Sequence, residues 1–599
     1  MGARPPREVF SAPSRKTSCA KESAIGAWDH ASKLLAARAR PATPGAGVLP
    51  NFGIRDYLSC FLALCLRRVS NVRPMAAAQS EHFNFSTDIL DAWAKSHPRA
   101  LGLWCVDAQG GAEEKFTFRR LSRLSRQAAH CLETAGVRRG DRVLLMLPRI
   151  WQWWVAMLGL IRLGAIPVPA TLLMTAGDVA YRLKTARVRA VITTAEGIEK
   201  TGDFTGLRFL ADKTAPAAGW LDFDAGLAAA DPAHRTAPTR RDDPGIIYFT
   251  SATTGEPKMV LHTQASYGLG HRLTGELLLD CRPGEVHWNI SDLGWGKAAW
   301  SSFYGPWHMG ACVFALNFAK FEPVLVLNTL ARYPIATWCV PPTALRLIAR
   351  QDLTRWKFPH LRRCITAGEP LNPEVFKIWQ TATGLELHEG YGQTETVVLV
   401  GNFKGRRVYP GSMGRATPGI HVAIVDQDLQ ELPDGREGEI AVRIRPDRPP
   451  GLFQEYLDCP EAMAEHFHGD WYLTGDRAVR DREGYFWFIG RKDDVIKSSG
   501  YRIGPFEVES AMLEHPAVLD VAVVGKPDEI RGQIVKAFVV LNPQYAPTED
   551  LRHELQQHCK TVTAPFKYPR EIEFLQVLPK TISDKTRRFK LREAERQHP

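Results

Sequence analysis

The chain has 599 residues, of which 45% are hydrophobic and 24% are charged, a composition typical of a soluble globular protein. A chain of this length is too long for one compact core, so we expect at least two domains. No run reaches the roughly 18 uncharged apolar residues that a membrane-spanning helix needs, and we therefore expect no transmembrane segment.

The formal net charge of +11 is concentrated near the N-terminus. Residues 1–74 hold 12 Lys or Arg against 4 Asp or Glu, whereas the rest of the chain holds 64 against 61. The body of the protein thus lacks the excess of basic residues that nucleic-acid binding requires. This distribution argues against a nucleic-acid partner and is compatible with an anionic small molecule.

Residues 1–74 are rich in Arg, Ser, Ala and Pro and show little periodic pattern, so we expect disorder there. Two interpretations stay open. The segment is either a mitochondrial transit peptide, because it is Arg-rich and poor in acidic residues, or translated sequence upstream of a true start at Met75. The first interpretation gives a protein of the mitochondrial matrix. The second, which we adopt, gives a cytoplasmic protein.

An amphipathic helix is predicted to begin in the segment from Phe85 to Trp93, and helical and strand patterns then alternate from about residue 115 to 400. Apolar strands are predicted at 142–147, 165–168, 189–193, 245–249 and 361–365. A helical pattern passes through Trp154 and Ile161, between the first two of these strands. Such alternation is typical of α/β layers with mainly parallel sheets.

After residue 419 the pattern changes to short strands separated by turn signals, at 422–425, 439–443 and 485–489. These strands predict a β-rich subdomain. From about residue 495 we expect a small α+β unit with helices at 507–513 and 548–559 and strands at 518–524 and 535–541. The predicted fold class is α/β, with a large N-terminal domain of layered α/β sheets, a β-rich subdomain and a small α+β C-terminal domain.

A polar loop directly follows the predicted strand that ends at Phe249. It contains four hydroxyl groups, one glycine and one lysine within the nine residues Thr250, Ser251, Ala252, Thr253, Thr254, Gly255, Glu256, Pro257 and Lys258. Hydroxyls and backbone N–H groups can cradle phosphate oxygens, and a lysine adds a positive charge. The Walker A pattern GxxxxGK[ST] is absent. Taken alone, the segment is either a phosphate loop of another kind or a polar surface loop.

Six further motifs follow this loop. They are TAGEPL at 366–371, EGYGQTET at 389–396, YLTGD at 472–476, GRKDDVIK at 490–497, SGYR at 499–502 and PKTISDK at 579–585. In their order and spacing the seven motifs resemble the adenylate-forming superfamily, which comprises acyl-CoA synthetases, adenylation domains and luciferases. The resemblance covers residues from about 80 to 595.

The resemblance implies an enzyme that activates a carboxylic acid with ATP as an acyl-adenylate. ATP would be bound by the loop from Thr250 to Lys258 together with Gly368, Glu369, Pro370, Glu389, Gly390, Tyr391, Gly392, Gln393, Thr394, Asp476, Arg491 and Lys585. In this set Tyr391 would stack on adenine, and Thr394 would contact the α-phosphate. Asp476 would accept hydrogen bonds from the ribose, assisted by Arg491.

Two further roles follow from the same resemblance. Glu395 would hold Mg²⁺, a hard cation that prefers carboxylate oxygen. Lys585 would be the catalytic lysine, because an ammonium group near the α-phosphate and the substrate carboxylate stabilises the adenylation transition state.

The resemblance also implies that the small domain swings between two half-reactions. Lys492, Asp493 and Asp494 match the hinge, with Asp493 as the pivot. We therefore expect a large AMP-binding domain at 75–492 and a mobile C-terminal domain at 493–599. After the swing, coenzyme A (CoA) would be bound by Ser499, Gly500, Tyr501, Arg502, Arg531, Lys560, Tyr568, Pro569 and Arg570, whose cations suit its phosphates.

Within the superfamily the sequence is most similar to medium-chain acyl-CoA synthetases, on Ser291-Asp292, Gly294-Trp295, residues 299–302 and residues 567–570. Gly392 stands where acetyl-CoA synthetases have a tryptophan that closes the acyl pocket. With Trp295 as a second pocket residue, we expect an acid longer than acetate. Candidates are fatty acids from butyrate to decanoate, or a benzoate-like aromatic acid.

Two positions depart from the family pattern, since Ala252 and Asp584 both stand where glycine is usual. They motivate the hypothesis of a catalytically impaired homologue that binds nucleotide or acyl ligand. A second alternative is an adenylation enzyme that loads a carrier protein, but the basic residues of the CoA set argue against it.

Overall fold

The computed structural model describes residues 80–110, 113–211, 217–250, 256–499, 501–581 and 585–597. The predictions made for residues 1–74, for Ser251 to Gly255, for Gly500 and for Asp584 lie outside these ranges. None of the helices that the structure describes has the length and apolarity of a membrane span. The helix expected near Phe85 is present as a π-helical turn, η2 (Ser86–Leu90), that continues into α3 (Asp91–Ser96).

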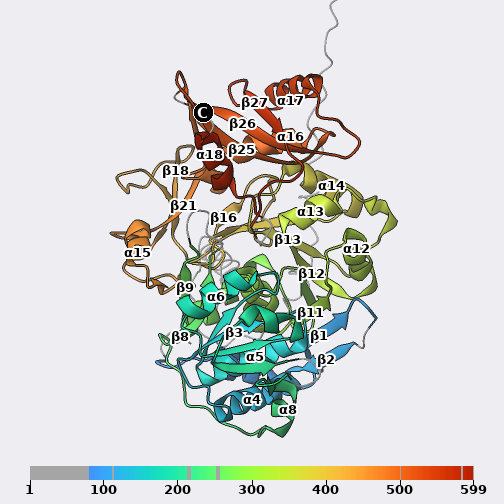
Figure 1. The fold of residues 1–599 in the computed structure, drawn as a ribbon, viewed down its shortest axis with the longest axis vertical. Helices are drawn as coiled ribbons and strands as arrows, with labels where there is room; N and C mark the ends of the chain where they lie inside the picture. Colours follow the sequence, from blue (N-terminus) through green and yellow to red (C-terminus); the bar gives the residue numbers. More distant parts are fainter. Residues whose placement is uncertain are drawn as a thin grey trace, which may run out of the picture. The chain divides into compact units, whose positions relative to one another are not determined.

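A five-stranded parallel sheet forms the first layer of the large domain, in the order β4-β3-β5-β6-β7. Its strands are β3 (Arg142–Met146), β4 (Ile166–Pro169), β5 (Ala190–Thr193), β6 (Leu207–Leu210) and β7 (Leu221–Asp222). Helix α5 (Trp151–Leu163) is buried on nearly every side because it has no polar face. It ends at Gly164, whose left-handed φ of 76° favours a residue without a Cβ. Figure 1 shows α5 with α4 (Phe118–Thr134) and α8 (Phe223–Ala229) gathered at this layer.

The largest sheet has 14 strands, and one half of it is mainly parallel. This half contains β1 (Leu101–Asp107), β10 (Val286–Asn289), β11 (Cys312–Asn317), β12 (Ile335–Val340), β13 (Arg363–Ala367) and β14 (Leu387–Tyr391), with β2 (Glu114–Thr117) as an antiparallel edge. Helices α12 (Pro323–Arg332), α13 (Pro342–Ile348) and α14 (Pro373–Thr383) connect its strands. Because parallel strands end at one edge, the motifs after β13 and β14 meet there.

The other half of this sheet is antiparallel. It contains β15 (Val400–Gly401), β16 (Gly414–Ala416), β17 (Val422–Val425), β18 (Glu437–Arg443), β21 (Trp471–Arg480) and β22 (Tyr485–Arg491), with β20 (Phe467–His468) beside β21. The predicted β-rich segment is therefore continuous with the parallel strands, through the pairing of β14 with β15. The pairing of β21 with β22 sets Asp476 opposite Arg491.

A separate three-stranded sheet contains the ends of the predicted phosphate loop. Strands β8 (Pro244–Phe249) and β9 (Met259–Thr263) form an antiparallel pair, and β19 (Glu455–Leu457) pairs with β9. Around this sheet and the large one are α6 (Ala176–Thr185), α7 (Ala195–Ile198), α9 (Gln264–Leu273), α10 (Gly296–Ala299), α11 (Gly305–His308) and α15 (Pro460–His466).

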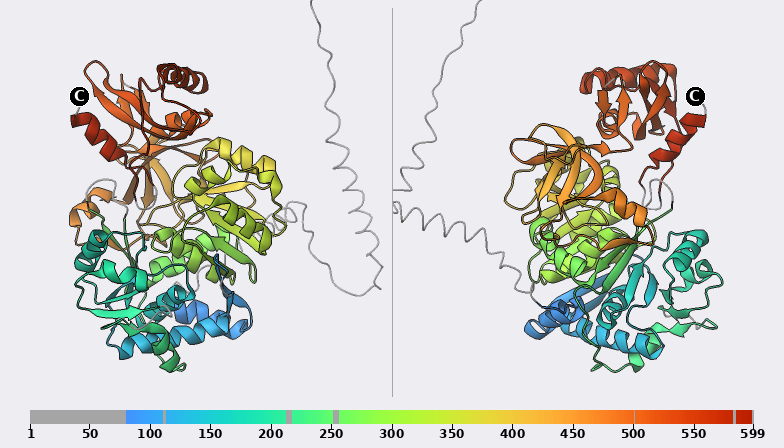
Figure 2. Two further views of the ribbon diagram at one scale, coloured as in Figure 1. Left: turned by 45° about the vertical axis from the view of Figure 1, so that its right-hand side comes forward. Right: turned by 90° about the vertical axis from the view of Figure 1, so that its left-hand side faces the viewer.

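The elements after residue 495 surround two hydrophobic clusters, one that includes Val508 and Val535 and one that includes Phe538 and Leu591. These elements are β23 (Ile496–Ser498), β24 (Tyr501–Ile503), α16 (Pro505–Leu513), β25 (Val518–Asp528), β26 (Gly532–Leu541), α17 (Glu549–Val562), β27 (Glu571–Phe574) and α18 (Arg588–Gln597). Both views of Figure 2 show them, in red, as one group. The boundary at residues 492 and 493 stays a prediction.

Candidate active site

A cavity of about 430 Å³ lies where the ends of β13 and β14 meet β21, β22 and the segment before α18. Its lining includes most of the described residues predicted to bind ATP: Thr250, Glu256, Lys258, Gly368, Glu369, Pro370, Glu389, Gly390, Tyr391, Gly392, Gln393, Thr394, Asp476, Arg491 and Lys585. Glu395 and Asp493 line it as well, whereas Pro257 does not. The fold thus brings together side chains that lie far apart in the sequence.

The two described ends of the phosphate loop are joined to each other. The N–H of Thr250 donates to the carbonyl of Lys258 at 2.9 Å, and the N–H of Lys258 donates to the Thr250 hydroxyl at 3.1 Å. The Lys258 ammonium lies 3.9 Å from Glu465 and over the ring of Tyr456. The hairpin of β8 and β9 therefore presents the Lys258 cation to the cavity.

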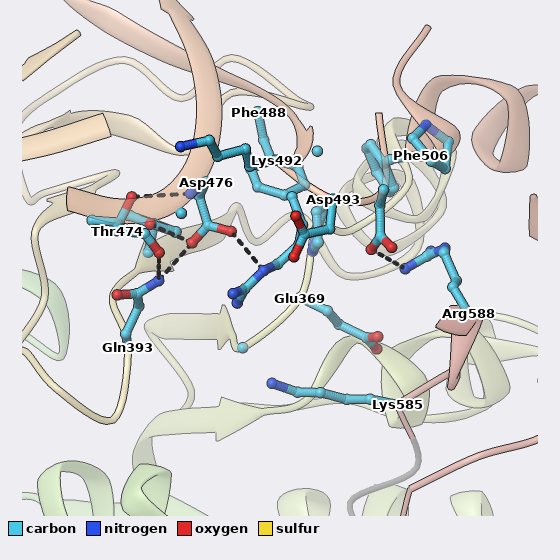
Figure 3. A pocket seen from close by; sticks show the side chains of 18 of the residues that line it. Glu369, Gln393, Thr474, Asp476, Phe488, Lys492, Asp493, Phe506, Lys585 and Arg588 are labelled. Carbon is cyan, nitrogen blue, oxygen red and sulfur yellow. Dashed lines mark hydrogen bonds and ion pairs between the residues drawn. The ribbon is translucent and has the colours of Figure 1, made fainter. Parts of the chain in front are cut away.

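Asp476 is the centre of a hydrogen-bond network on β21. Its Oδ2 accepts from the Tyr391 hydroxyl at 2.6 Å and from the Gln393 amide at 2.7 Å, while its Oδ1 lies 3.7 Å from Nε of Arg491. Figure 3 shows the bond from Gln393, and it also shows the Asp476 N–H, which donates to the Thr474 hydroxyl at 3.2 Å. Burial raises the pKa of Asp476, and Arg491 opposes that effect. Since Oδ2 already has two donors, Oδ1 is the oxygen available to a ligand.

Thr394 is held through its backbone. Its carbonyl accepts from the Tyr267 hydroxyl at 2.6 Å and from Nε2 of His262 at 2.8 Å. Burial lowers the pKa of His262 to about 3, so the ring is neutral and Nε2 carries the donated proton. His262 belongs to β9, the strand that leaves the phosphate loop. One strand therefore connects the loop to the Thr394 turn.

Glu395 has one oxygen engaged and one available. Its Oε1 accepts from the Tyr456 hydroxyl at 2.8 Å, and its side chain lines the cavity. Within the described residues no hydrogen bond engages Oε2. A carboxylate held in this way is suited to bind Mg²⁺ together with substrate phosphates, because Mg²⁺ commonly takes one or two carboxylates from the protein. No group of three or more His, Cys, Asp or Glu residues arranged for a metal occurs in the described chain.

Lys585 and Glu369 both line the cavity, and Figure 3 shows them one above the other with their charged ends pointing in opposite directions. Loss of hydration lowers the pKa of Lys585, and the charge of Glu369 opposes this effect. Glu369 also accepts from Arg346 at 3.0 Å. Burial raises the pKa of Glu389 to about 8, and its Oε2 has no hydrogen-bond partner among the described residues. At pH 7 a mostly neutral carboxyl group thus lines the cavity, next in sequence to Gly390 and Tyr391.

The sequence reasoning missed several residues that support the site, among them Arg346, which lines the cavity. His262, Tyr267 and Lys297 were also missed, and they contact Thr394 or Ala367 without lining the cavity. Lys297 is half-buried and donates to the carbonyl of Ala367 at 2.9 Å. Loss of hydration lowers its pKa, although Cys339 and Glu369 oppose this effect. None of these residues lies inside the recognised motifs. Lys297 could have been noted as a charge in an otherwise apolar stretch that follows Trp295.

Of the two predicted acyl-pocket residues, only one lines the cavity. Gly392 lines the cavity, and a Cβ on it would lie 2.5 Å from the carbonyl oxygen of Val397. The close backbone approach therefore requires a glycine there, in addition to any space needed by an acid. Trp295 does not line the cavity, but it precedes Gly296, whose added Cβ would lie 3.8 Å from the Thr394 side chain.

The predicted CoA residues lie outside this cavity. Arg531 donates to the Ser499 hydroxyl at 3.3 Å, and Tyr501 stacks on Phe566 with ring centroids 4.3 Å apart. In a second cluster, the Lys560 ammonium and the Arg570 guanidinium both lie at the Tyr568 ring, with Pro569 between Tyr568 and Arg570. Arg502 lies 3.8 Å from Glu437. The described CoA set is thus grouped on the C-terminal unit.

Residues before and after the predicted hinge form ion pairs with different elements. Lys492 lies 3.4 Å from Glu439 on β18, whereas Asp494 pairs with Arg592 on α18. Asp493, between them, makes no side-chain hydrogen bond or ion pair within the described residues. The side chain of Asp493 is therefore less restrained than those of its two neighbours.

Comparisons with known proteins agree with this geometry. Residues 90–457 match the family described as AMP-binding enzyme, and residues 507–585 match the AMP-binding enzyme C-terminal domain. The chain is 45% identical over 529 residues to the acyl-coenzyme A synthetase ACSM3, mitochondrial, of Rattus norvegicus, covering 86% of this chain and 91% of that protein. It is 48% identical over 530 residues to the acyl-coenzyme A synthetase ACSM5, mitochondrial, of the same species, with the same coverage. The solved anthranilate CoA ligase AuaEII, in complex with anthranoyl-AMP, superposes with a TM-score of 0.79 at 29% identity, over 88% of this chain and 99% of that one.

Proposed function

Since the chain belongs to the AMP-binding enzyme family and is an ATP-dependent acyl-CoA synthetase of the medium-chain type, we propose that the cavity is where its acyl-adenylate forms. The observation that carries this proposal is the convergence of Lys585, Asp476, Thr394 and Glu395 on one cavity. These side chains supply a cation, a ribose acceptor, a phosphate contact and a metal ligand. The substrates of the enzyme are a carboxylic acid, ATP and CoA.

In the first step a carboxylate oxygen attacks the α-phosphorus of ATP, the P–O bond to pyrophosphate breaks, and pyrophosphate leaves. Lys585 would stabilise the negative charge that develops on the α-phosphate oxygens. Asp476 would hold the ribose through Oδ1, and Tyr391 would lie against adenine while its hydroxyl keeps Asp476 in place. Lys258 and the phosphate loop would retain the β- and γ-phosphates.

We propose that Glu395 holds Mg²⁺ through Oε2, with Tyr456 fixing Oε1. When bound, the ion would neutralise charge on the phosphates. The Tyr456 hydroxyl orients the carboxylate toward the cavity, and orientation of this kind is how an outer partner raises metal affinity.

In the second step the CoA sulfur attacks the acyl carbonyl and AMP leaves. We propose that the C-terminal domain begins at Asp493 and rotates about this residue. The rotation would remove Lys585 from the cavity and bring residues 499–502 there instead. The change of ion-pair partners from Lys492 to Asp494 supports this position for the hinge. The cations Arg531, Lys560 and Arg570 would bind the CoA phosphates.

For the acid, we propose a medium-chain fatty acid or an aromatic carboxylic acid. The similarity to ACSM3 and ACSM5 supports the medium-chain candidates, and the similarity to an anthranilate CoA ligase supports the aromatic ones. For the location we propose the mitochondrion, because both rat relatives are named mitochondrial. The cytoplasmic location expected from a start at Met75 receives no support from them.

The test is pyrophosphate release by the full chain with ATP and Mg²⁺, over acids from acetate to dodecanoate plus benzoate and anthranilate, with and without CoA. We expect CoA-dependent turnover with a maximum at butyrate to decanoate or at an aromatic acid. A maximum at acetate would contradict the proposed acid. The absence of release with every acid, while ATP still binds, would favour an impaired homologue.

A further inference from the structure

Lys585, the proposed catalytic lysine, lies shortly before α18, and its backbone is hydrogen-bonded to Thr581. The N–H of Thr581 donates to the carbonyl of Lys585 at 2.7 Å, and the N–H of Lys585 donates back to the Thr581 hydroxyl at 3.0 Å. Arg588, three residues later, is the first residue of α18. The position of Lys585 therefore depends on how firmly the start of α18 is held.

Arg588 is held by a bidentate ion pair. Its Nη2 donates to both oxygens of Glu509, at 2.8 and 2.6 Å, and its Nε donates to Oε1 at 3.0 Å. Glu509 is itself fixed, because it is buried on α16 and Oε1 also accepts from the N–H of Val523 at 2.8 Å. Burial would lower the pKa of Arg588, but Glu509 and Asp494 outweigh that effect and raise it. The guanidinium is therefore a permanent cation with a rigid partner.

The same arginine also reaches the predicted hinge. Nη1 of Arg588 lies 3.8 Å from Oδ2 of Asp494, and Arg592, one turn further along α18, pairs with Oδ1 of the same carboxylate. Both carboxylates are largely buried, with side-chain exposures of 7% for Glu509 and 13% for Asp494. An ion-pair network thus joins α16, the hinge and the start of α18.

We propose that Arg588 is a positioning residue for adenylation, which fixes the start of α18 against Glu509 and Asp494 and so holds Lys585 at the cavity. Figure 3 shows this arrangement, with Arg588 paired to a carboxylate above Lys585 and Glu369. The inference rests on the proposed role of Lys585. It adds that one guanidinium, three residues after Lys585, contacts both Glu509 and the predicted hinge residue Asp494.

The planar fork of arginine is needed for this role. A lysine at position 588 would keep the charge, but it could not donate to both oxygens of Glu509 in one plane while also facing Asp494. An alanine would leave the buried Glu509 without its partner and would free the start of α18. The rate of adenylation, the step that uses Lys585, should therefore be the rate that falls.

The test compares the two half-reactions in the full chain. Acid-dependent exchange of pyrophosphate into ATP reports adenylation, and CoA-thioester formation from a supplied acyl-adenylate reports transfer. For Arg588→Ala we expect an exchange rate at least about tenfold lower and a transfer rate within about twofold of the parent. Arg588→Lys should give an intermediate exchange rate. Lys590→Ala, which removes an exposed cation from the same helix, should leave both rates within about twofold.

Equal losses in both half-reactions of Arg588→Ala, or no loss in exchange, would overturn the inference. If Arg588→Ala does not fold, Arg588→Lys decides by the same criterion. Lys585→Ala separates this inference from its premise. If Lys585→Ala loses adenylation selectively and the Arg588 variants do not, only the positioning role of Arg588 is overturned. Equal losses in Lys585→Ala would count against the proposed role of Lys585 itself.

Discussion

Replacement of Tyr267 by phenylalanine would test how the Thr394 turn is held. The side chain is only 1% exposed, and its hydroxyl donates to the Thr394 carbonyl at 2.6 Å. Phenylalanine keeps the packing and removes one neutral hydrogen bond, worth about 0.5–1.5 kcal/mol. The carbonyl keeps its second donor, His262 at 2.8 Å, so it is not left without a partner. If the whole loss is expressed in the adenylation transition state, the rate should fall by roughly 2- to 12-fold.

The assay is acid-dependent pyrophosphate exchange at varied ATP concentration, with the thermal unfolding midpoint measured in parallel. The matched control is Tyr248→Phe, because Tyr248 is also 1% exposed and its hydroxyl has no hydrogen-bond partner among the described residues. We expect the control to stay within about twofold of the parent. An unchanged rate in Tyr267→Phe, or an equal loss in both variants, would refute the reasoning.

Three further predictions follow from the cavity. Lys585→Ala should slow adenylation by about 10²-fold or more and leave thioester formation from a supplied acyl-adenylate within about threefold, as separate half-reaction assays would show. Glu395→Gln should raise the Mg²⁺ concentration for half-maximal pyrophosphate release by about tenfold, and an unchanged Mg²⁺ titration would contradict the proposed ligand. For Glu389 the folded-state pKa is raised to about 8, whereas the unfolded-state pKa is about 4.3. The contribution of this group to the free energy of unfolding is therefore fully present below about pH 4.3 and is lost as the pH rises to about 8. Unfolding midpoints from pH 5 to 9 should therefore decline less in Glu389→Gln than in the parent.

Local patterns predicted individual elements of the fold. The strand predicted at 142–147 is present as Arg142–Met146, and the helix predicted at 548–559 is present as Glu549–Val562. Both have strong hydrophobic patterns, which determine an element's type better than its ends. The β-rich segment was predicted as a subdomain, but its hydrogen-bonded continuity with the parallel strands was not. A strand's sequence specifies which face is buried and does not specify its neighbour.

The contacts missed by the sequence reasoning share one property, which is long separation along the chain. Tyr267 and Thr394 are 127 positions apart, and Lys297 and Ala367 are 70 apart. Neither pair leaves a periodic signal in either segment. The hydrogen bond from the Tyr391 hydroxyl to Asp476 was missed for the same reason, although both residues were already assigned to the ATP set.

The sequence by itself determined the alternation of elements, the order of the seven motifs and, through them, the class of chemistry, because these are properties of neighbouring residues. The tertiary structure alone decided which oxygen of Asp476 and of Glu395 is available, why Gly392 must lack a side chain, and how Arg588 joins α16 to the hinge. Each of these depends on how the strands and helices pack, which brings distant groups into contact or excludes a single methyl group. Such contacts are set by packing across the whole domain.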